Sequence, residues 1–165
     1  MKANVFILYL LLFIVIGCTS QQNDQPTQQQ KEQIKNEVKT IYDSLITSAN
    51  KPNMNGFLQY YSPELVAVFD TVFVDYQTYE NAVLNFSKAN VSLKWTTFQF
   101  ESIVLTKDFV ITTWIGMLEQ LLESGDQIIT NPRKYINVLK KVDGQWKVIF
   151  ENGSGIPVRV KADKK

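Results

Sequence analysis

Five side chains in the last third of the sequence could together form the wall of a binding cavity. Trp114, Tyr135 and Phe150 offer aromatic surface, while Asn137 and Asn152 offer amide groups. Ligand cavities are typically apolar with a few polar groups that fix orientation, and this mixture has that character. The alternative is an ordinary core face whose amides bond to nearby groups, because most sheet faces are only cores.

A turn signal predicts that these five side chains share one face of a sheet. Asp143-Gly144 separates two alternating runs, RKYINVLKKV and QWKVIFENGS, and Asp-Gly tolerates the positive φ angles of a two-residue hairpin turn. Pairing then starts at Val142 with Gln145 and alternates between the two faces. On the cavity face the predicted pairs are Lys141 with Trp146, Leu139 with Val148, Asn137 with Phe150 and Tyr135 with Asn152. On the opposite face they are Lys140 with Lys147, Val138 with Ile149 and Ile136 with Glu151.

A second turn, at Ser124-Gly125, joins the preceding strand to this hairpin. Whether its loop has two residues or four, Leu122 is expected to pair with Gln127. Counting outward from that pair places Trp114 opposite Tyr135 and Thr112 opposite Asn137.

The first residues read as a targeting segment rather than as part of a domain. Lys2 precedes the apolar run Val5–Ile16, which is shorter than the roughly 20 residues of a membrane-spanning helix. The run ends in Val15-Ile16-Gly17-Cys18, which resembles the lipobox of bacterial lipoproteins. This resemblance implies that residues 1–17 are a signal peptide and that Cys18 is the lipidated first residue of the mature chain, anchored by its acyl chains. The alternative is an ordinary secretory signal with an incidental cysteine.

Composition bounds the remaining possibilities. Removing residues 1–17 takes away one Lys and no acid, which leaves 16 basic and 16 acidic residues. No basic stripe is visible, so nucleic acid is not expected as a partner. The chain has no His, and its one Cys is assigned to lipid. Neither a usual zinc site nor a nucleophile activated by His is therefore expected, and no metal or cofactor is predicted.

The order of the predicted elements indicates an α+β fold in one domain, with helices first and antiparallel strands afterwards. Residues 18–30 are rich in Gln, Ser, Asn and Thr and read as a flexible tether, and the tail 157–165 is expected to be frayed. The predicted helices are Lys31–Ala49, Asn55–Tyr61 and one capped by Thr78, with Tyr79, Val83 and Phe86 buried. The predicted strands are Leu65–Phe69, Val91–Thr106 (with a bulge), Asp108–Glu123, Ile128–Val142 and Gln145–Asn152.

Three features resemble the nuclear-transport-factor-2-like (NTF2-like) superfamily, which includes SnoaL-like cyclases and ketosteroid isomerases. They are the long first helix, the passage Tyr60-Tyr61-Ser62-Pro63 followed by Val68-Phe69-Asp70, and the ending Lys140–Val148 with its Asp-Gly-x-Trp hairpin. The resemblance covers residues 31–156. It implies a curved sheet that forms a cone, helices over its mouth and ligands inside.

The same resemblance points to two candidate catalytic residues. The isomerases place a general-base Asp just after the first short strand, where Asp70 stands, and use a Tyr on the first helix, for which Tyr42 is the nearest match. Burial of Asp70 in an apolar cone would favour proton transfer. The alternatives are an exposed turn residue at Asp70 and core packing at Tyr42. The second acidic residue of the isomerases has no counterpart here, and Phe150 and Asn152 stand where relatives often carry His.

The predicted outer face of the sheet carries an apolar cluster of Ile111, Ile136, Val138 and Ile149. Members of the superfamily commonly dimerise through this convex surface, so a homodimer is a possible assembly. The alternative is that these residues only reflect strand propensity.

The sequence therefore favours a bacterial lipoprotein on the periplasmic or extracellular face of a membrane, with a non-catalytic cone domain that binds a small apolar molecule. Two alternatives stay open. One is an isomerase- or cyclase-like enzyme that uses Asp70 as general base, and the other is a protein-interaction module.

Overall fold

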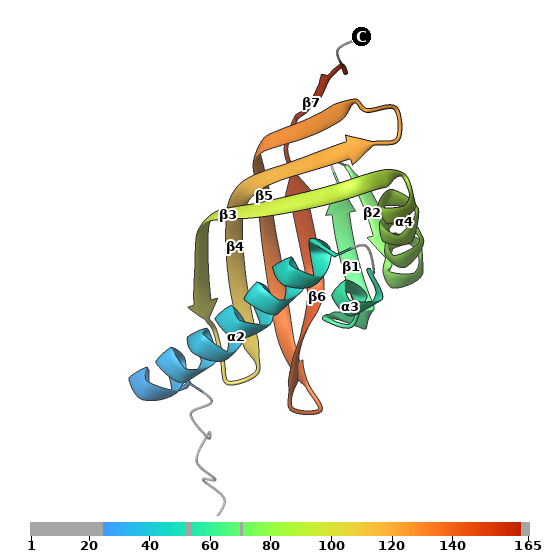
Figure 1. Ribbon diagram of the computed structural model, residues 1–165. Helices are drawn as coiled ribbons and strands as arrows, with labels where there is room; N and C mark the ends of the chain where they lie inside the picture. Colours follow the sequence, from blue (N-terminus) through green and yellow to red (C-terminus); the bar gives the residue numbers. More distant parts are fainter. Residues whose placement is uncertain (1–24, 52–53, 70, 163–165) are drawn as a thin grey trace, which may run out of the picture.

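The computed structural model describes residues 25–51, 54–69 and 71–162. Three helices, α2 (Gln28–Ala49), α3 (Asn55–Leu58) and α4 (Tyr76–Lys88), lie against a curved seven-stranded sheet (Figure 1). The strands are β1 (Tyr61–Phe69), β2 (Val72–Asp75), β3 (Asn90–Val104), β4 (Phe109–Leu122), β5 (Gln127–Val142), β6 (Gln145–Ser154) and β7 (Pro157–Val160).

The strand order confirms the predicted α+β architecture. It runs β2-β1-β6-β5-β4-β3, and β7 pairs with β5 off this path. All pairs are antiparallel except β1 with β6, which is parallel. The first and last parts of the domain are thus joined at the centre of the sheet, while β3 and β4 extend it and curve over α2 (Figure 1).

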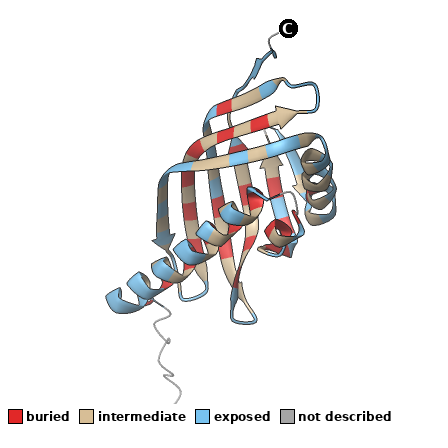
Figure 2. Cartoon of the chain, in the orientation of Figure 1, coloured by how far each residue is buried: buried red, intermediate tan, exposed pale blue. Residues whose placement is uncertain are grey.

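Helix α2 buries one side against the concave face of the sheet. Its buried residues are Ile34, Val38, Tyr42, Leu45 and Ala49, at the spacing of a single helical stripe. In Figure 2 most of the remaining length of α2 is pale blue or tan. The helix begins at Gln28, three residues before the predicted Lys31. Thr27 provides the reason, since it forms a capping box with Gln30.

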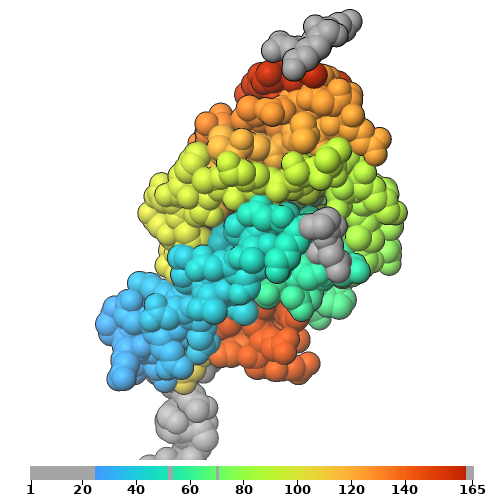
Figure 3. Space-filling model, viewed as in Figure 1, coloured from blue at the N-terminus to red at the C-terminus, as the bar shows by residue number. Residues whose placement is uncertain are grey.

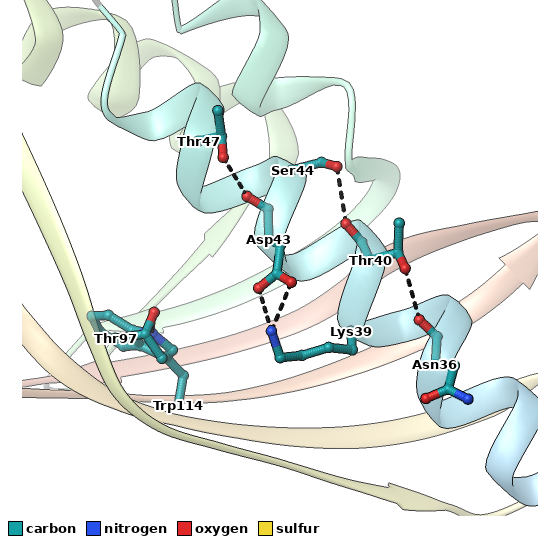
Figure 4. A network of polar contacts seen from close by, with 8 residues as sticks. All are labelled: Asn36, Lys39, Thr40, Asp43, Ser44, Thr47, Thr97 and Trp114. Atoms are coloured by element: carbon teal, nitrogen blue, oxygen red, sulfur yellow. Dashed lines mark hydrogen bonds and ion pairs between the residues drawn. The ribbon is translucent and has the colours of Figure 1, made fainter.

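The solvent face of α2 satisfies its polar groups locally. Lys39 forms an ion pair with Asp43 at 2.5 Å. The hydroxyl groups of Thr40, Ser44 and Thr47 donate to the carbonyl oxygens four residues earlier, at 2.7–2.9 Å (Figure 4). This face therefore contributes little to holding the helix on the sheet.

The Asp-Gly-x-Trp hairpin attaches α2 to the far end of the sheet. Trp146 is buried, and its indole N–H donates to Oε2 of Glu37 at 3.0 Å. Lys141, which pairs with Trp146 across the hairpin, donates to the same oxygen at 3.1 Å. The indole hydrogen bond is the largest influence that holds the pKa of Glu37 below its usual value. The hairpin motif thus has a structural role in fixing the first helix.

The predicted register of β5 with β6 is correct only near the turn. Val142 pairs with Gln145, Lys141 with Trp146, and Leu139 with Val148, as expected. Beyond them β6 carries an extra residue, Ile149, and the register shifts by one. The pairs are Val138 with Phe150, Asn137 with Glu151, Ile136 with Asn152 and Tyr135 with Gly153, so the predicted pairs for these residues are wrong.

The register of β4 with β5 differs from the prediction near the turn and agrees with it farther along the strands. Leu121 rather than Leu122 pairs with Gln127, so the prediction at the turn is wrong. A bulge at Asn131 and Pro132 then shifts the register, which suits Pro because it has no N–H for the ladder. Beyond the bulge Trp114 pairs with Tyr135 and Thr112 with Asn137, as predicted.

Local predictions elsewhere had mixed outcomes. The bulge expected in the first long strand lies between Thr97 and Gln99 of β3. Asp75, not Thr78, caps α4, because its carboxylate accepts a hydrogen bond from the backbone N–H of Thr78 at 2.9 Å.

The expectation of a frayed tail is wrong for Pro157–Val160, which pairs with β5. Asp126 supports this strand by accepting hydrogen bonds from Arg159 and from the backbone of Ala162.

Candidate functional site

A cavity of about 340 Å³ lies between the concave face of the sheet and the helices. In the space-filling view α2, coloured blue to teal, covers this side of the sheet, with α4 and β3 beside it (Figure 3). The cavity wall is mainly aromatic. Its aromatic lining residues are Tyr42, Phe57, Tyr61, Phe69, Tyr79, Phe86, Trp95, Trp114 and Tyr135.

Three of these rings form a continuous wall across β3, β4 and β5. The ring centroids of Trp114 and Tyr135 are 5.5 Å apart, and Trp95 lies 5.7 and 5.9 Å from them. The indole N–H of Trp114 donates to the hydroxyl of Thr97 at 2.8 Å, and the two side chains lie together on the sheet in Figure 4. The polar atom of this indole is thus satisfied, and its rings remain as apolar surface.

Two glycines make room for these rings. A Cβ at Gly116 would come 2.5 Å from Cζ2 of Trp114, and one at Gly153 would come 2.6 Å from Cε1 of Tyr135. Both distances are far inside ordinary contact. The rings can therefore lie flat along the wall only because these two positions lack a side chain.

Glu151 is a buried carboxyl in this aromatic cavity, with 3% of its surface exposed. Tyr61 donates to its Oε2 at 2.8 Å, and Tyr79 donates to its Oε1 at 3.0 Å. Burial raises the pKa of Glu151 to about 7, although the two hydroxyl groups and Arg133 lower it in part. The carboxyl therefore changes charge near neutral pH. Such a raised pKa is unusual for a glutamate, and groups with shifted pKa values are concentrated at functional sites.

Arg133 brings a second charge to the cavity wall. Its Nε and Nη2 donate to the hydroxyl oxygen of Tyr135 at 3.1 and 3.0 Å, and its guanidinium carbon lies 4.9 Å from the centroid of that ring. No carboxylate among the described residues forms an ion pair with Arg133. This cation is held in place by an aromatic ring rather than by an opposite charge.

Asn137 supplies an unsatisfied polar atom. Its side chain lines the cavity and is 3% exposed, and its Oδ1 has no hydrogen-bond partner among the described residues. The register places it between Thr112 on β4 and Glu151 on β6. A buried acceptor without a partner is costly, so this position suits a ligand that donates a hydrogen bond.

The structure brings together three of the five predicted pocket residues. Trp114, Tyr135 and Asn137 line the cavity, but Phe150 and Asn152 do not. The reason for this correction is the extra residue Ile149, which places Phe150 opposite Val138 and Asn152 opposite Ile136, on the outer face.

The two candidate catalytic residues and the lipidation site have different outcomes. Tyr42 lines the cavity and packs on Phe100, with ring centroids 4.5 Å apart, and burial raises its pKa. Asp70 and Cys18 lie outside the residues that the structure describes. The structure therefore gives neither a position.

Sequence reasoning missed Glu151, which it had placed on the outer face. One signal could have revealed it. Val148-Ile149-Phe150 is a run of three apolar residues in a strand that otherwise alternates, and such a change of phase is typical of a bulge. Arg133 was missed because a charged residue on a strand usually faces solvent.

Residues 25–51, 54–69 and 71–162 contain neither a candidate metal site nor a membrane-spanning helix. No three His, Cys, Asp or Glu side chains there are grouped in a way that could hold a metal ion. No helix there has both the length and the hydropathy that a membrane crossing needs.

No protein-family model matches the sequence, and no curated protein matches it. Solved structures do share its architecture. A proposed scytalone dehydratase from Novosphingobium aromaticivorans DSM 12444 has a TM-score of 0.73 at 7% identity, covering 84% of this chain and 94% of that one. The hexachlorocyclohexane dehydrochlorinase type 3 from Novosphingobium barchaimii LL02 has a TM-score of 0.68 at 12% identity, covering 81% and 94%.

A third structure is an NTF2-like protein of unknown function from Pseudomonas putida KT2440. Its TM-score is 0.64 at 14% identity, and the match covers 74% of this chain and 87% of that one. At such identities the likeness shows the fold alone. The chain has the NTF2-like α+β cone fold.

Replacing Glu151 with Gln should flatten the dependence of stability on pH. The carboxyl pKa is about 7 in the folded chain and 4.5 in the reference state, so the folded state binds the proton more tightly. The free energy of unfolding should therefore fall as pH rises from about 4.5 to 7, by about 3 kcal/mol, and then level off. Urea denaturation at pH 5, 6, 7 and 8 measures this slope.

The exposed Glu123 supplies the matched control. Glu123→Gln should keep the slope of the original chain, whereas Glu151→Gln should lose most of it. Equal slopes in the two variants would show that Glu151 does not carry this proton.

Proposed function

We propose that this protein binds a small, largely apolar molecule in its cone and acts as a membrane-anchored, non-catalytic binding protein. The observation that carries the proposal is the cavity of about 340 Å³ with a wall of nine aromatic residues. This volume lies at the lower end of the range for small-molecule sites, and an apolar wall with few polar groups is their usual composition.

The polar groups of the cavity support a binding role because they are few and spatially fixed. Two tyrosines hold Glu151, one tyrosine holds Arg133, and Asn137 leaves an acceptor open to a ligand. Such groups fix the orientation of a bound molecule while the rings provide most of the contact area.

A plug at the cavity mouth should prevent binding without disturbing the core. Ala82 on α4 lines the cavity and is exposed, so Ala82→Trp adds an indole there. We expect the affinity of the full-length chain for N-phenyl-1-naphthylamine, a neutral apolar probe, to fall at least about tenfold by fluorescence titration.

Asn81→Trp is the matched control, because Asn81 is exposed on the same helix and does not line the cavity. It should leave probe affinity within twofold. Native mass spectrometry of both variants should show a retained molecule only in Asn81→Trp. Equal binding by the two variants would place the ligand elsewhere on the protein.

The membrane anchor is proposed from the lipobox-like sequence that ends at Cys18. Two or more acyl chains give stable attachment, since each buried methylene contributes about 0.8 kcal/mol. Cys18→Ser should therefore move the protein from the membrane fraction to the soluble fraction when bacterial cells are lysed and fractionated. Retention of the variant in the membrane fraction would contradict lipidation at Cys18.

A second candidate is an isomerase- or cyclase-like enzyme, and the buried Glu151 is the observation that favours it. A carboxyl with a pKa of about 7 inside an apolar cavity is suited to accept a proton. Asp70, the base implied by the family resemblance, remains the alternative base. Two structural neighbours also bear the names of enzymes, a proposed dehydratase and a dehydrochlorinase.

Deuterium exchange into 2-tetralone tests this candidate, because a base in the cone would remove a proton next to the carbonyl. An enzyme should accelerate exchange above the buffer rate, and Glu151→Gln or Asp70→Asn should abolish the acceleration, which identifies the base. Exchange at the buffer rate in the original chain would remove the reason to treat the protein as this kind of enzyme.

A third candidate is a protein-interaction module that dimerises through the outer face. The bulge at Ile149 gives this face an apolar row across five strands: Ile103, Ile111, Val138, Phe150 and Val66. Val66 and Ile103 are largely exposed, at 43% and 58%. Sedimentation velocity that gives a monomer at every concentration would exclude this assembly.

A further inference from the structure

We infer that the molecule bound in the cone is an amphipathic monocarboxylate, whose carboxylate is received by Arg133 and whose apolar body lies against the ring wall. The inference rests on the proposed binding function and specifies its ligand class. The ring wall is defined as Trp95, Trp114 and Tyr135.

No carboxylate of the described residues contacts Arg133, and Glu151, whose pKa the charge of Arg133 lowers, acts on it only at longer range. A guanidinium remains charged at all ordinary pH values and offers five N–H donors. The bonds from Nε and Nη2 both go to one neutral oxygen, the hydroxyl of Tyr135. Arg133 is only partly buried, and its remaining N–H donors can form a charge-assisted pair with a carboxylate in the cavity.

The guanidinium of Arg133 is held in position in the chain without a ligand. It lies over the ring of Tyr135, and a Cβ at Gly155 would come 3.1 Å from its Cδ, so the side chain packs closely against the backbone there. A planar guanidinium held in one orientation matches a carboxylate through two parallel hydrogen bonds. Preorganisation lowers the entropic cost of forming that pair.

Apart from Arg133 and Glu151, the described residues that line the cavity carry no charged side chain. Glu151 forms no ion pair with Arg133. Its carboxylate oxygens accept hydrogen bonds from Tyr61 and Tyr79 instead. Arg133 thus keeps donors for an anionic ligand.

Glu151 adds a dependence on pH that a neutral ligand would not show. The groups that face it are Tyr61 on β1, Tyr79 on α4, Tyr42 on α2, and Tyr135 and Arg133 on β5. Burial raises the pKa of all four tyrosines, so Glu151 is the member of this group that changes charge near pH 7. Its negative charge would repel a carboxylate, and a carboxylate ligand should therefore bind more tightly below pH 7 than above it.

Three naphthalene probes of similar size test the ligand class by calorimetric titration of the full-length chain. They are 1-naphthaleneacetate, 2-(1-naphthyl)ethanol and 2-(1-naphthyl)ethylamine, which carry an anionic, a neutral and a cationic group. We expect the acetate to bind at least about tenfold more tightly than the alcohol, because a charge-assisted bidentate pair adds to the same apolar contact.

Arg133→Gln should lower the ratio of acetate affinity to alcohol affinity from at least about tenfold to about one. Lys134→Gln is the matched control, since it removes the same charge from the exposed neighbouring residue. It should change neither affinity. Arg133→Lys, which keeps the charge and loses the planar donor pair, should give an intermediate affinity for the acetate.

A pH series separates Glu151 from Arg133. Affinity for the acetate should fall several-fold from pH 6 to pH 8 in the original chain and stay flat in Glu151→Gln. A far-ultraviolet circular dichroism spectrum and a cooperative thermal transition like those of the original chain show that Arg133→Gln is folded.

The outcomes distinguish this inference from the proposed function. Equal affinity for the three probes, preference for the amine, or an acetate affinity that survives Arg133→Gln would overturn the carboxylate assignment while apolar binding stands. Failure of the full-length chain to bind any naphthalene probe, including N-phenyl-1-naphthylamine, would overturn both.

Discussion

The position of one extra residue in β6 decides what kind of cavity this protein has. Alternation from Trp146 and Val148 would turn Phe150 inward and Glu151 outward. Ile149 interrupts that alternation, and every residue after it changes face. The cavity thereby gains a carboxyl, and the outer face gains an aromatic ring. A strand without the bulge would have placed Phe150 and Asn152 in the cavity instead of Glu151.

The buried carboxyl also links parts of the fold that are far apart in sequence. Tyr61 reaches Glu151 from β1, and Tyr79 reaches it from α4, of which it is the buried residue. Leaving a carboxylate without these donors in an apolar site would cost several kcal/mol. The two hydrogen bonds reduce that cost, and they hold α4 against the sheet at the cavity mouth. The same contact therefore serves the stability of the fold and the polarity of the site.

The site combines fixed polar groups with a rigid aromatic surface. Glu151 and Arg133 are oriented by tyrosines. Trp114 and Tyr135 pack beside glycines, and Trp114 also donates a hydrogen bond to Thr97. Electrostatic interactions inside an apolar cavity are strong, because little water screens the charges. Such a cavity discriminates between ligands by the sign and place of one polar group, while the rings accept varied apolar bodies. This combination is the basis of the proposed binding role, and the buried carboxyl of Glu151 is the basis of the proposed enzymatic alternative.

The sequence by itself determined the features that depend on neighbouring residues. Helical periodicity predicted α2, Asp143-Gly144 predicted the hairpin and its first pairs, and the order of elements predicted an α+β fold. Only the tertiary structure decided three features of the site. They are the inward position of Glu151, the absence of a hydrogen-bond partner for Oδ1 of Asn137 among the described residues, and the position of Arg133 over the ring of Tyr135. The physical reason is that a bulge forms where a curved sheet must fit its helices. The run Val148-Ile149-Phe150 indicates a bulge, but which residue is extra, and so which side chains turn inward, depends on contacts between distant strands.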